Sequence, residues 1–366
     1  MFLAHRNLIQ NKTRLLLSVG GVSLAIMLIL LLNGFLAGMN RQITSYIDNS
    51  TGSLIIAQKG VDNLLGATSL LSVNALEDVK KVNGVNDVVP ILSQFVIFDL
   101  RGKKLPAYLI GYDPNQGGGP WKIREGREPM TDTEMVFDDV LAKRNDLQIG
   151  DKFEILGQDF TIVGLSENTT SWMTSFFFIR ISAAKKLLRN PGAISFLLIT
   201  PEKNIETGNL LKNLNRISGI NAITKNEIAD NDIRLFAKVF SAPIKLMVFI
   251  SFLVGTMIVG LIIYTATVER QREYGVLKAI GAANQILYKV VITQAFVTSL
   301  IGALLSILLA FSVGNWIMAI RPQFLILFDP LDVLWAILAG VGMALFAAFI
   351  PTRVLAKLAP AEVFQK

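Results

Sequence analysis

Four long runs without a charged residue constrain this chain more than any other feature. The runs are Leu15–Asn40, Leu246–Val268, Val290–Ile320 and Val333–Thr352. Each is at least 20 residues long, and a helix of about 20 apolar residues crosses a hydrocarbon core about 30 Å thick. A mean hydropathy of +0.50 also sets the chain apart from ordinary soluble proteins. We therefore expect a membrane α-helical protein with four transmembrane helices, at residues 15–40, 245–268, 290–320 and 333–352.

The distribution of charge predicts the side of the membrane on which each connecting segment lies. Residues 1–14, 269–289 and 353–366 together hold ten Lys/Arg and three Asp/Glu, which accounts for the whole net charge of +7. Basic residues concentrate in cytoplasmic loops, so we expect the lead-in 1–14, the central loop 269–289 and the tail 353–366 to be cytoplasmic. Residues 41–244 and the short loop 321–332 are then extracytoplasmic. The excess of basic residues therefore reflects membrane topology and is not evidence of nucleic-acid binding, so we expect no nucleic-acid partner.

Between the first two runs lies a large segment of soluble composition, which we expect to form an α+β extracytoplasmic domain at 41–244. Strand-like patterns occupy 53–59, 86–102, 104–114 and 193–200, and helix-like patterns occupy 73–85 and 207–220. The break NQGGGP at 115–120 predicts two parts. Residues of about 51–114 with 193–235 form one α+β subdomain, and residues 115–192 form a mostly β subdomain with a hairpin across LGQD. Residues 41–47 and 233–245 are expected to be helical stalks.

Little catalytic chemistry is present in this sequence. The chain has no cysteine and one histidine, His5, so thiolate metal sites and histidine-based triads are excluded. A Gly-x-x-x-x-Gly-Lys-Ser/Thr phosphate loop is absent, and the four runs hold no charge that could relay ions. Asp138, Asp139 and Asp146 are interpreted as solvated loop carboxylates and not as a cation site. We expect a chain that is not itself an enzyme and binds no metal or cofactor.

The segment Val268–Gln294, VERQREYGVLKAIGAANQILYKVVITQ, joins the second and third runs. On a helix, Tyr274, Leu277 and Gly281 share one face, while Arg270, Glu273 and Lys278 lie on or beside the other. This pattern predicts a short amphipathic helix closed by Gly281. A helix tethered at both ends to membrane helices can pass movement from a soluble partner into the membrane. The alternative is a charged, solvated loop without a partner.

Three stretches of the chain resemble the MacB/FtsX-like permease family, the membrane subunits of type VII ABC transporters. They are RNLIQNKTRLLLSVGGVSLA before and within the first run, the 268–294 segment with Gly275, Lys278, Ala279 and Gly281, and PTRVLAKLAPAEVF after the last run. The stretches VNGVNDVVP and EGREPMTDTEMVFDDVLAKRNDLQIGDKFEILGQDFTIVGL are similar to the family's extracytoplasmic subdomains. The resemblance runs along the whole chain, except that no ATPase domain is fused to it.

The resemblance implies a permease subunit of an ABC-type exporter in a bacterial plasma (inner) membrane. It implies a homodimer that binds two copies of a separate ABC ATPase, in which ATP and Mg²⁺ are bound, and in some relatives a membrane-fusion or adaptor protein. Transport by mechanotransmission would extrude a hydrophobic or amphipathic cargo such as a lipoprotein, peptide, drug, glycolipid or haem. The implied ATPase-coupling residues are Glu269, Arg270, Arg272, Glu273, Tyr274, Gly275, Leu277, Lys278, Ala279 and Gly281, with tail contacts at Arg353, Lys357 and Pro360.

Two alternatives remain open at this point. The first is an FtsX-like transmembrane signal transmitter that activates an extracytoplasmic hydrolase; the size of the 41–244 domain favours the exporter. The second is haem or another hydrophobic toxicant as cargo, with Met27, Met39, Tyr46 and the apolar stretch 171–179 near the outer mouth. For that apolar stretch a buried strand is the simpler interpretation, because side chains of these types usually pack in a core.

Overall fold

The computed structural model describes residues 12–100, 102–172 and 174–357, so most of the predicted lead-in lies outside the described residues. The described chain divides into two units. Unit 1 comprises residues 12–38, 240–321 and 325–357, and unit 2 comprises residues 39–239 and 322–324. Each unit is described by itself.

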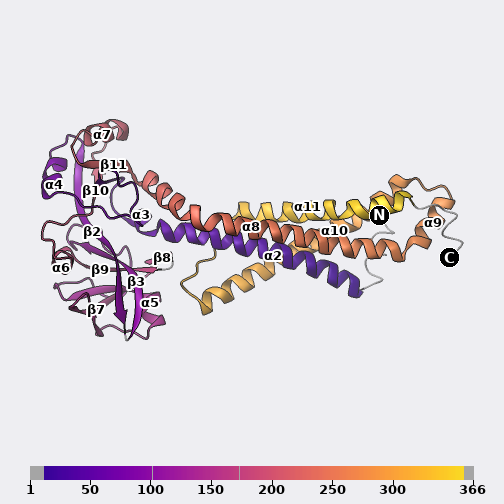
Figure 1. Cartoon of the computed structure of the whole chain (residues 1–366), viewed down its shortest axis with the longest axis horizontal. Helices are drawn as coiled ribbons and strands as arrows, with labels where there is room; N and C mark the ends of the chain where they lie inside the picture. The colour runs from indigo at the N-terminus through magenta and orange to yellow at the C-terminus, as the bar shows by residue number, and fades with distance from the viewer. Residues whose placement is uncertain (1–11, 101, 173, 358–366) are drawn as a thin grey trace. The chain divides into compact units, whose positions relative to one another are not determined.

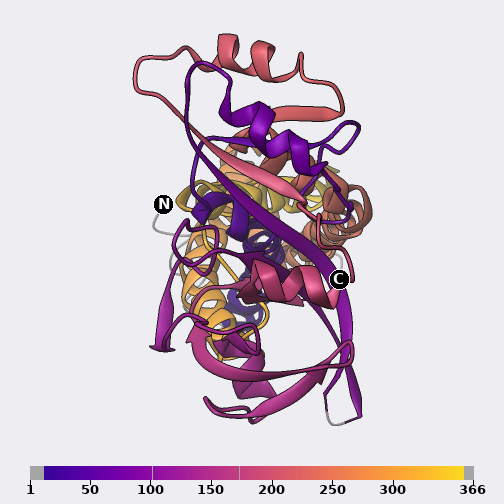
Figure 2. The same ribbon diagram turned by 90° about the vertical axis from the view of Figure 1, so that its left-hand side faces the viewer.

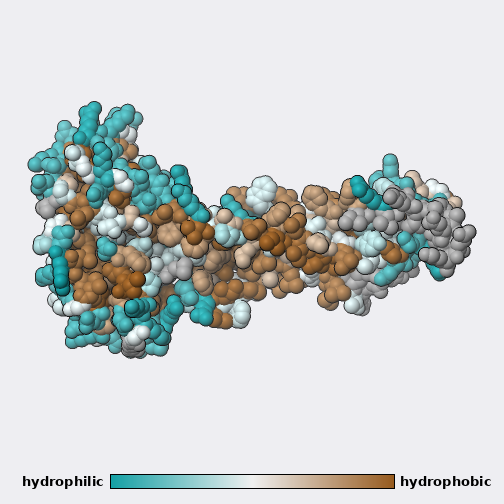
Figure 3. Space-filling model, in the orientation of Figure 1, coloured by the Kyte–Doolittle hydropathy of each residue, from teal (hydrophilic) through white to brown (hydrophobic). Residues whose placement is uncertain are grey.

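Unit 1 consists of one short helix and most of four long helices (Figure 1). They are α2 (Lys12–Ile43), α8 (Lys225–Glu269), α9 (Gln271–Ala279), α10 (Asn284–Ile320) and α11 (Pro330–Lys357), of which α2 ends and α8 begins in unit 2. The four long helices are those long and apolar enough to cross a membrane, which confirms the predicted number of spans. Their outward surfaces are largely hydrophobic, as the brown areas over these helices show (Figure 3). The chain is a multi-pass membrane protein.

Helix α2 packs against the other three long helices at positions that lack a side chain. A Cβ built on Gly255 of α8 would lie 2.6 Å from Ala25, and one on Gly302 of α10 would lie 2.7 Å from Val22. On α11, a Cβ at Gly340 would collide with Ile26. Small residues allow this close approach of helices within a bilayer.

A polar contact strengthens the contact between α2 and α10. The Ser23 hydroxyl lies 2.6 Å from the carbonyl of Val19 in its own helix and 3.0 Å from the carbonyl of Gly302. The second carbonyl is accessible because Gly302 has no side chain to shield it. The contact between the Ser23 hydroxyl and the Gly302 carbonyl therefore helps to fix the register of α2 against α10.

The loop between α10 and α11 lies along α2. The N–H of Leu327 donates to the carbonyl of Gly34 at 3.0 Å. A Cβ at Gly38 would overlap the carbonyl of Leu325. Two glycines one helical turn apart thus let an extended segment reach the backbone of a helix.

Unit 2 is built on one mixed sheet of eleven strands. Its order is β11-β1-β10-β2-β3-β9-β5-β7-β4, with β6 paired to β7 and β8 paired to β9. The strands are β1 (Leu54–Gln58), β2 (Val85–Leu100), β3 (Lys103–Tyr112), β4 (Ile123–Gly126), β5 (Glu134–Asp138), β6 (Lys152–Ile155), β7 (Gln158–Ser166), β8 (Thr170–Ser171), β9 (Thr174–Arg180), β10 (Phe196–Pro201) and β11 (Ile220–Thr224). The short helices are α3 (Ser45–Asn49), α4 (Val73–Lys80), α5 (Asp139–Arg144), α6 (Ile181–Leu187) and α7 (Thr207–Leu214). The predicted α+β domain between the first two membrane helices is confirmed.

The long strand β2 joins two cores within unit 2 (Figure 2). Its first half pairs with β10 up to Ile91, and its second half pairs with β3 from Leu92 onward. One core gathers side chains of β1, β10, α4 and α7, and the other gathers β3, β5, β7 and β9 with the second half of β2. The division at residues 114 and 115 therefore stays a prediction, because the second core also takes side chains from residues 92–109.

Several local predictions are confirmed by these elements. The apolar stretch 171–181 contains β9, whose residues 175–179 are buried. The hairpin across LGQD is the β6–β7 connection, in which Ile155 is paired with Gln158. The predicted stalk at 233–245 is helical and continuous with the following run, because α8 passes through Pro243 without ending.

Candidate functional site

The candidate site is the connection between α8 and α10, which unit 1 presents as the short helix α9 (Figure 1). Helix α8 ends at Glu269, α9 spans Gln271–Ala279, and α10 begins at Asn284. The predicted amphipathic helix is therefore present. Its N-cap, Arg270, has a φ of −101° and a ψ of 18°, which breaks the helix geometry between α8 and α9.

Gly281 ends α9 through a Schellman motif. The N–H of Ala282 donates to the carbonyl of Leu277 at 2.9 Å, and the N–H of Gly281 donates to the carbonyl of Lys278 at 3.0 Å. This pattern requires a left-handed residue after the helix, and Gly281 has a φ of +99°. Gly281 closes the helix as predicted, but it lies beyond the helix and does not continue the face of Tyr274 and Leu277.

Tyr274 anchors α9 to the helix bundle. It is 5% exposed and packs in one core with Ile263, Leu287 and Val291, while Leu277 packs at the margin of this core. Burial raises the pKa of the Tyr274 hydroxyl. Gly275 is also buried. The predicted inner face of the helix is thus confirmed for Tyr274 and Leu277, and movement of α9 must involve the ends of α8 and α10.

Most charged residues of the segment lie on its outer side, whereas the side chain of Arg270 is only 14% exposed. Glu269, Arg272 and Glu273 are exposed, and Lys278 is half-buried. The Arg270 guanidinium lies 3.5 Å from the Glu273 carboxylate, three residues along the chain. Ala279 is exposed as well. The outer surface can therefore offer both signs of charge to a partner.

Three exposed apolar side chains in and next to α9 were missed by the sequence analysis. Ile280 is 75% exposed, Ile286 is 55% exposed and Val276 is 45% exposed. Residues four positions apart share a helix face, so the Val276–Ile280 spacing was a usable signal. An exposed apolar group rimmed by charge is typical of a protein–protein contact. We call Val276, Ile280 and Ile286 the outer apolar group.

The predicted tail contacts are only partly described. The Arg353 guanidinium lies over the ring of Phe349, 4.3 Å from its centroid. Lys357 is the last residue of α11, but its side chain lies outside the described residues. Pro360 also lies outside the described residues.

The acidic residues once considered for a cation site have different roles. Asp138 and Asp139 are buried, so the interpretation as solvated carboxylates is wrong for both. Asp138 caps α5 by accepting the N–H of Leu141 at 2.9 Å and also accepts the hydroxyls of Thr169 and Ser175. Burial raises the pKa of Asp138.

Asp139 pairs with two cations at the start of α5. Its carboxylate lies 2.7 Å from Arg124 and 3.2 Å from Lys143. Asp146 is exposed, with a φ of 52°. No group of three or more metal-ligating side chains occurs within residues 12–100, 102–172 and 174–357.

The residues named for a haem-like cargo are packing residues where they are described. Met39 and Tyr46 are buried, and the Tyr46 hydroxyl donates to the carbonyl of Gly118 at 2.6 Å. Met27 packs at the margin of the core of unit 1. The interpretation of 171–179 as a buried strand is the one that the structure supports.

Comparison with known proteins defines the class. The family model of the MacB-like periplasmic core domain matches residues 15–217, and that of the FtsX-like permease C-terminal region matches residues 245–360. The first match covers more than half of the chain. The chain belongs to the MacB/FtsX-like family of ABC transporter permeases.

Two relatives of similar length are named as permeases. An uncharacterized ABC transporter permease of Mycobacterium tuberculosis is 23% identical over 371 residues, covering 100% of this chain and 99% of the relative. The "Putative hemin transport system permease protein HrtB" of Staphylococcus epidermidis is 23% identical over 317 residues, covering 86% of each chain. The periplasmic region of MacB from Actinobacillus actinomycetemcomitans is 15% identical, with a TM-score of 0.37, and covers 50% of this chain and 94% of its own.

Proposed function

We propose that the chain is the permease subunit of an ABC-type exporter that works by mechanotransmission. In this proposal a separate ATPase binds at α9, and its ATP-driven closure moves the helices that lead to the 41–244 domain. The observation that carries the proposal is α9 itself: a short helix anchored by Tyr274, closed by Gly281 and presenting the outer apolar group. The buried side of such a helix packs against the bundle, and its exposed side can bind a partner protein.

The continuity of α8 supports the transmission of movement. It is one helix from Lys225 to Glu269, so its first turns belong to unit 2 and its last turn leads into α9. Helices are stiff along their axes because each turn is hydrogen-bonded to the next. A displacement applied at Glu269 is therefore carried along the whole element.

The proposal extends to the partners and the location of the chain. We propose a homodimer with two ATPase subunits in a bacterial plasma (inner) membrane, with both termini and α9 in the cytoplasm and 41–244 outside. ATP and Mg²⁺ would be bound by the ATPase and not by this chain, and a membrane-fusion or adaptor protein would join in some settings. The excess of basic residues in 1–14, 269–289 and 353–366 supports this orientation.

The proposed cargo is hydrophobic or amphipathic. Among the relatives, the staphylococcal protein is named for hemin transport, which supports a cargo of this class at 23% identity. The described spans contain no buried ion pair that would form a polar pathway through the bilayer. Extrusion by the 41–244 domain, without passage through the helix bundle, is consistent with that composition.

Affinity purification of the tagged full-length chain from detergent-solubilised membranes tests the proposal. Wild type is compared with Gly275→Pro, Ile280→Glu and a variant with residues 270–281 scrambled, and ATP hydrolysis of each eluate is measured. We expect a co-purifying ATPase with wild type and its loss with all three variants. Met130→Glu, at a 68% exposed apolar residue of unit 2, is the matched control and should retain it.

The opposite result is equally clear. If Gly275→Pro and Ile280→Glu retain the ATPase at the wild-type ratio, α9 is not the docking element. If wild type itself yields no ATPase, the exporter proposal fails.

A further inference from the structure

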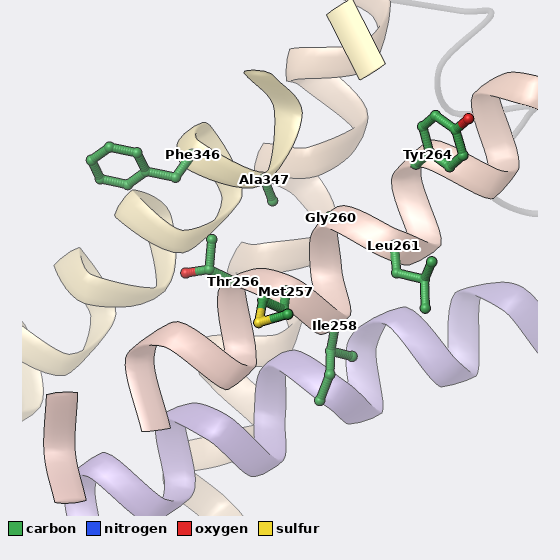
Figure 4. Close-up of a pocket in the computed structure, with 8 residues that line it drawn as sticks. All are labelled: Thr256, Met257, Ile258, Gly260, Leu261, Tyr264, Phe346 and Ala347. Carbon is green, nitrogen blue, oxygen red and sulfur yellow. The ribbon is translucent and has the colours of Figure 1, made fainter. Parts of the chain in front are cut away.

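A long groove opens between α8 and α11 in unit 1 (Figure 4). It has a volume of about 520 Å³ and is lined by Thr256, Met257, Ile258, Gly260, Leu261, Tyr264, Phe346 and Ala347. Met257, Leu261 and Phe346 are its prominent walls and are 73%, 64% and 68% exposed. The groove is therefore an open, apolar depression on the surface of the helix bundle.

Small residues make the floor, and the lining offers almost no hydrogen-bonding capacity. A Cβ built on Gly260 would meet Ala347 at 3.8 Å, so neither residue fills the space between the walls. The Thr256 hydroxyl donates to the carbonyl of Phe252 in its own helix at 2.8 Å. The groove therefore suits a flexible hydrocarbon and not a polar solute.

Helices α8 and α11 run in the same direction, so positions along one helix can be matched to positions along the other. Gly255 faces Met343, and Gly260 faces Ala347 further along both chains. Counting from the Gly260–Ala347 level at 1.5 Å per residue, Tyr264 lies about 6 Å and Arg353 about 9 Å toward the α9 end. Figure 4 shows Tyr264 apart from Phe346 and Met257 along the groove.

Arg353 does not itself line the groove, but helical periodicity puts it on the same face of α11 as Phe346, which does. Residues 346, 349 and 353 are three and four positions apart and so share one helix face, and Phe346 lines the groove. The Arg353 guanidinium is held over the Phe349 ring at 4.3 Å from its centroid, and the side chain is exposed. One end of the apolar groove is therefore marked by a hydroxyl and a fixed positive charge.

We propose that this groove binds an anionic phospholipid, with an acyl chain between α8 and α11 and the phosphate at Arg353 and Tyr264. Charge complementarity selects this occupant. A lipid phosphate can pair with the exposed Arg353 guanidinium, whereas an uncharged acyl chain cannot. A basic residue near the membrane surface contributes about 1 kcal/mol to the binding of anionic lipid. The site does not rest on the proposed contact of α9 with an ATPase, although Arg353 is also one of the tail contacts that the family resemblance implies.

Native mass spectrometry of the full-length chain, titrated with phosphatidylglycerol or phosphatidylcholine of identical acyl chains, tests the site. We expect tighter binding of phosphatidylglycerol, and a loss of about fivefold in its affinity with Arg353→Gln, without change for phosphatidylcholine. Arg321→Gln, at the exposed C-cap of α10, is the matched control and should bind as wild type does. Gly260→Leu fills the groove and should weaken the binding of both lipids.

Three results would overturn the proposal. Equal affinity of wild type for the two lipids removes the role of charge. Equal losses with Arg353→Gln and Arg321→Gln remove the role of this particular arginine. Efficient disulfide formation between copies carrying Phe346→Cys, in native membranes, would show that a second copy fills the groove in place of lipid.

Discussion

Asp232 is the buried carboxylate that ties α8 to the loop preceding α4 within unit 2. It is fully buried and accepts the N–H groups of Leu64 at 3.3 Å and Leu65 at 3.2 Å. Desolvation raises the pKa of Asp232 to about 7, and hydrogen bonds from Asn63 and the two backbone N–H groups oppose this rise. The strength of this contact therefore depends on pH near neutrality.

The direction of this dependence follows from proton linkage. The folded pKa of about 7 exceeds the ordinary value of 3.8, so the folded state binds more protons than the unfolded state between these values. Stability from this group is fully present below about pH 4, falls as the pH rises to about 7 and is constant above that. The span is at most about 4 kcal/mol. Asp232→Asn keeps an acceptor oxygen and should abolish this dependence.

Hydrogen exchange at the amides of Leu64 and Leu65 in the full-length protein measures the effect. After correction for intrinsic exchange rates, protection in wild type should fall from pH 5 to pH 7, whereas protection in Asp232→Asn should stay level. Equal slopes in the two proteins would show that Asp232 does not control the contact.

Gly281 has a conformational role that a substitution can isolate. A Cβ there would meet nothing within 4 Å, so the cost of Gly281→Ala arises from the backbone at φ +99° alone. We expect about 1–2 kcal/mol of local destabilisation. The amide of Ala282 should exchange roughly 5 to 30 times faster as its bond to Leu277 opens. Gly281→Asn is the control, because Asn tolerates this region, and an unchanged rate in Gly281→Ala would contradict the Schellman assignment.

At the scale of elements, the seam between α2 and α10 depends on Gly302. A Cβ at this position would lie 2.7 Å and 2.8 Å from atoms of Val22 and 3.3 Å from the carbonyl of Val19. Gly302→Val should force the helices apart, break the contact of Ser23 with this carbonyl and lower stability by about 1–3 kcal/mol. Thermal unfolding in detergent measures the loss. Gly20→Ala, where a Cβ meets nothing within 4 Å, should leave the midpoint of unfolding unchanged. Equal effects of the two substitutions would contradict the close packing of α2 and α10 at Gly302.

The elements themselves could largely be predicted from the sequence. A run without charge such as Val290–Ile320 has no alternative to a membrane helix, and strand-like alternation located β1, β3 and β10. The sheet order could not be predicted. β2 pairs at Ile91 with Phe196 but at Leu92 with Gly111, and no local pattern chooses partners so far apart in the chain.

The candidate site was predicted only on its inner side. Tyr274 and Leu277 followed from helical periodicity, and Gly281 followed from the preference of glycine for helix ends. The outer apolar group was missed because Val276 and Ile280 resemble ordinary core residues until the fold shows that they are exposed. The burial of Asp138 and Asp232 is likewise a tertiary property, because a carboxylate gives no local sign of the donors that will surround it.

At the scale of the whole molecule, the chain combines a membrane bundle without internal charge and a sheet domain without a metal-ligating cluster in its described residues. The chain belongs to a family of ABC transporter permeases, and our proposal assigns the source of energy to a partner ATPase that binds at α9. The central claim is therefore that α9 contacts an ATPase through Ile280.

Site-specific photo-crosslinking tests that claim most directly. p-Benzoylphenylalanine is placed at Ile280 in one protein and at Ile205, an exposed apolar residue of unit 2, in another. Cells are irradiated and the adducts are identified by mass spectrometry. The account predicts an ABC ATPase crosslinked to position 280 and not to position 205. An ATPase adduct at 205, or a well-expressed protein with no ATPase adduct at 280, would contradict it.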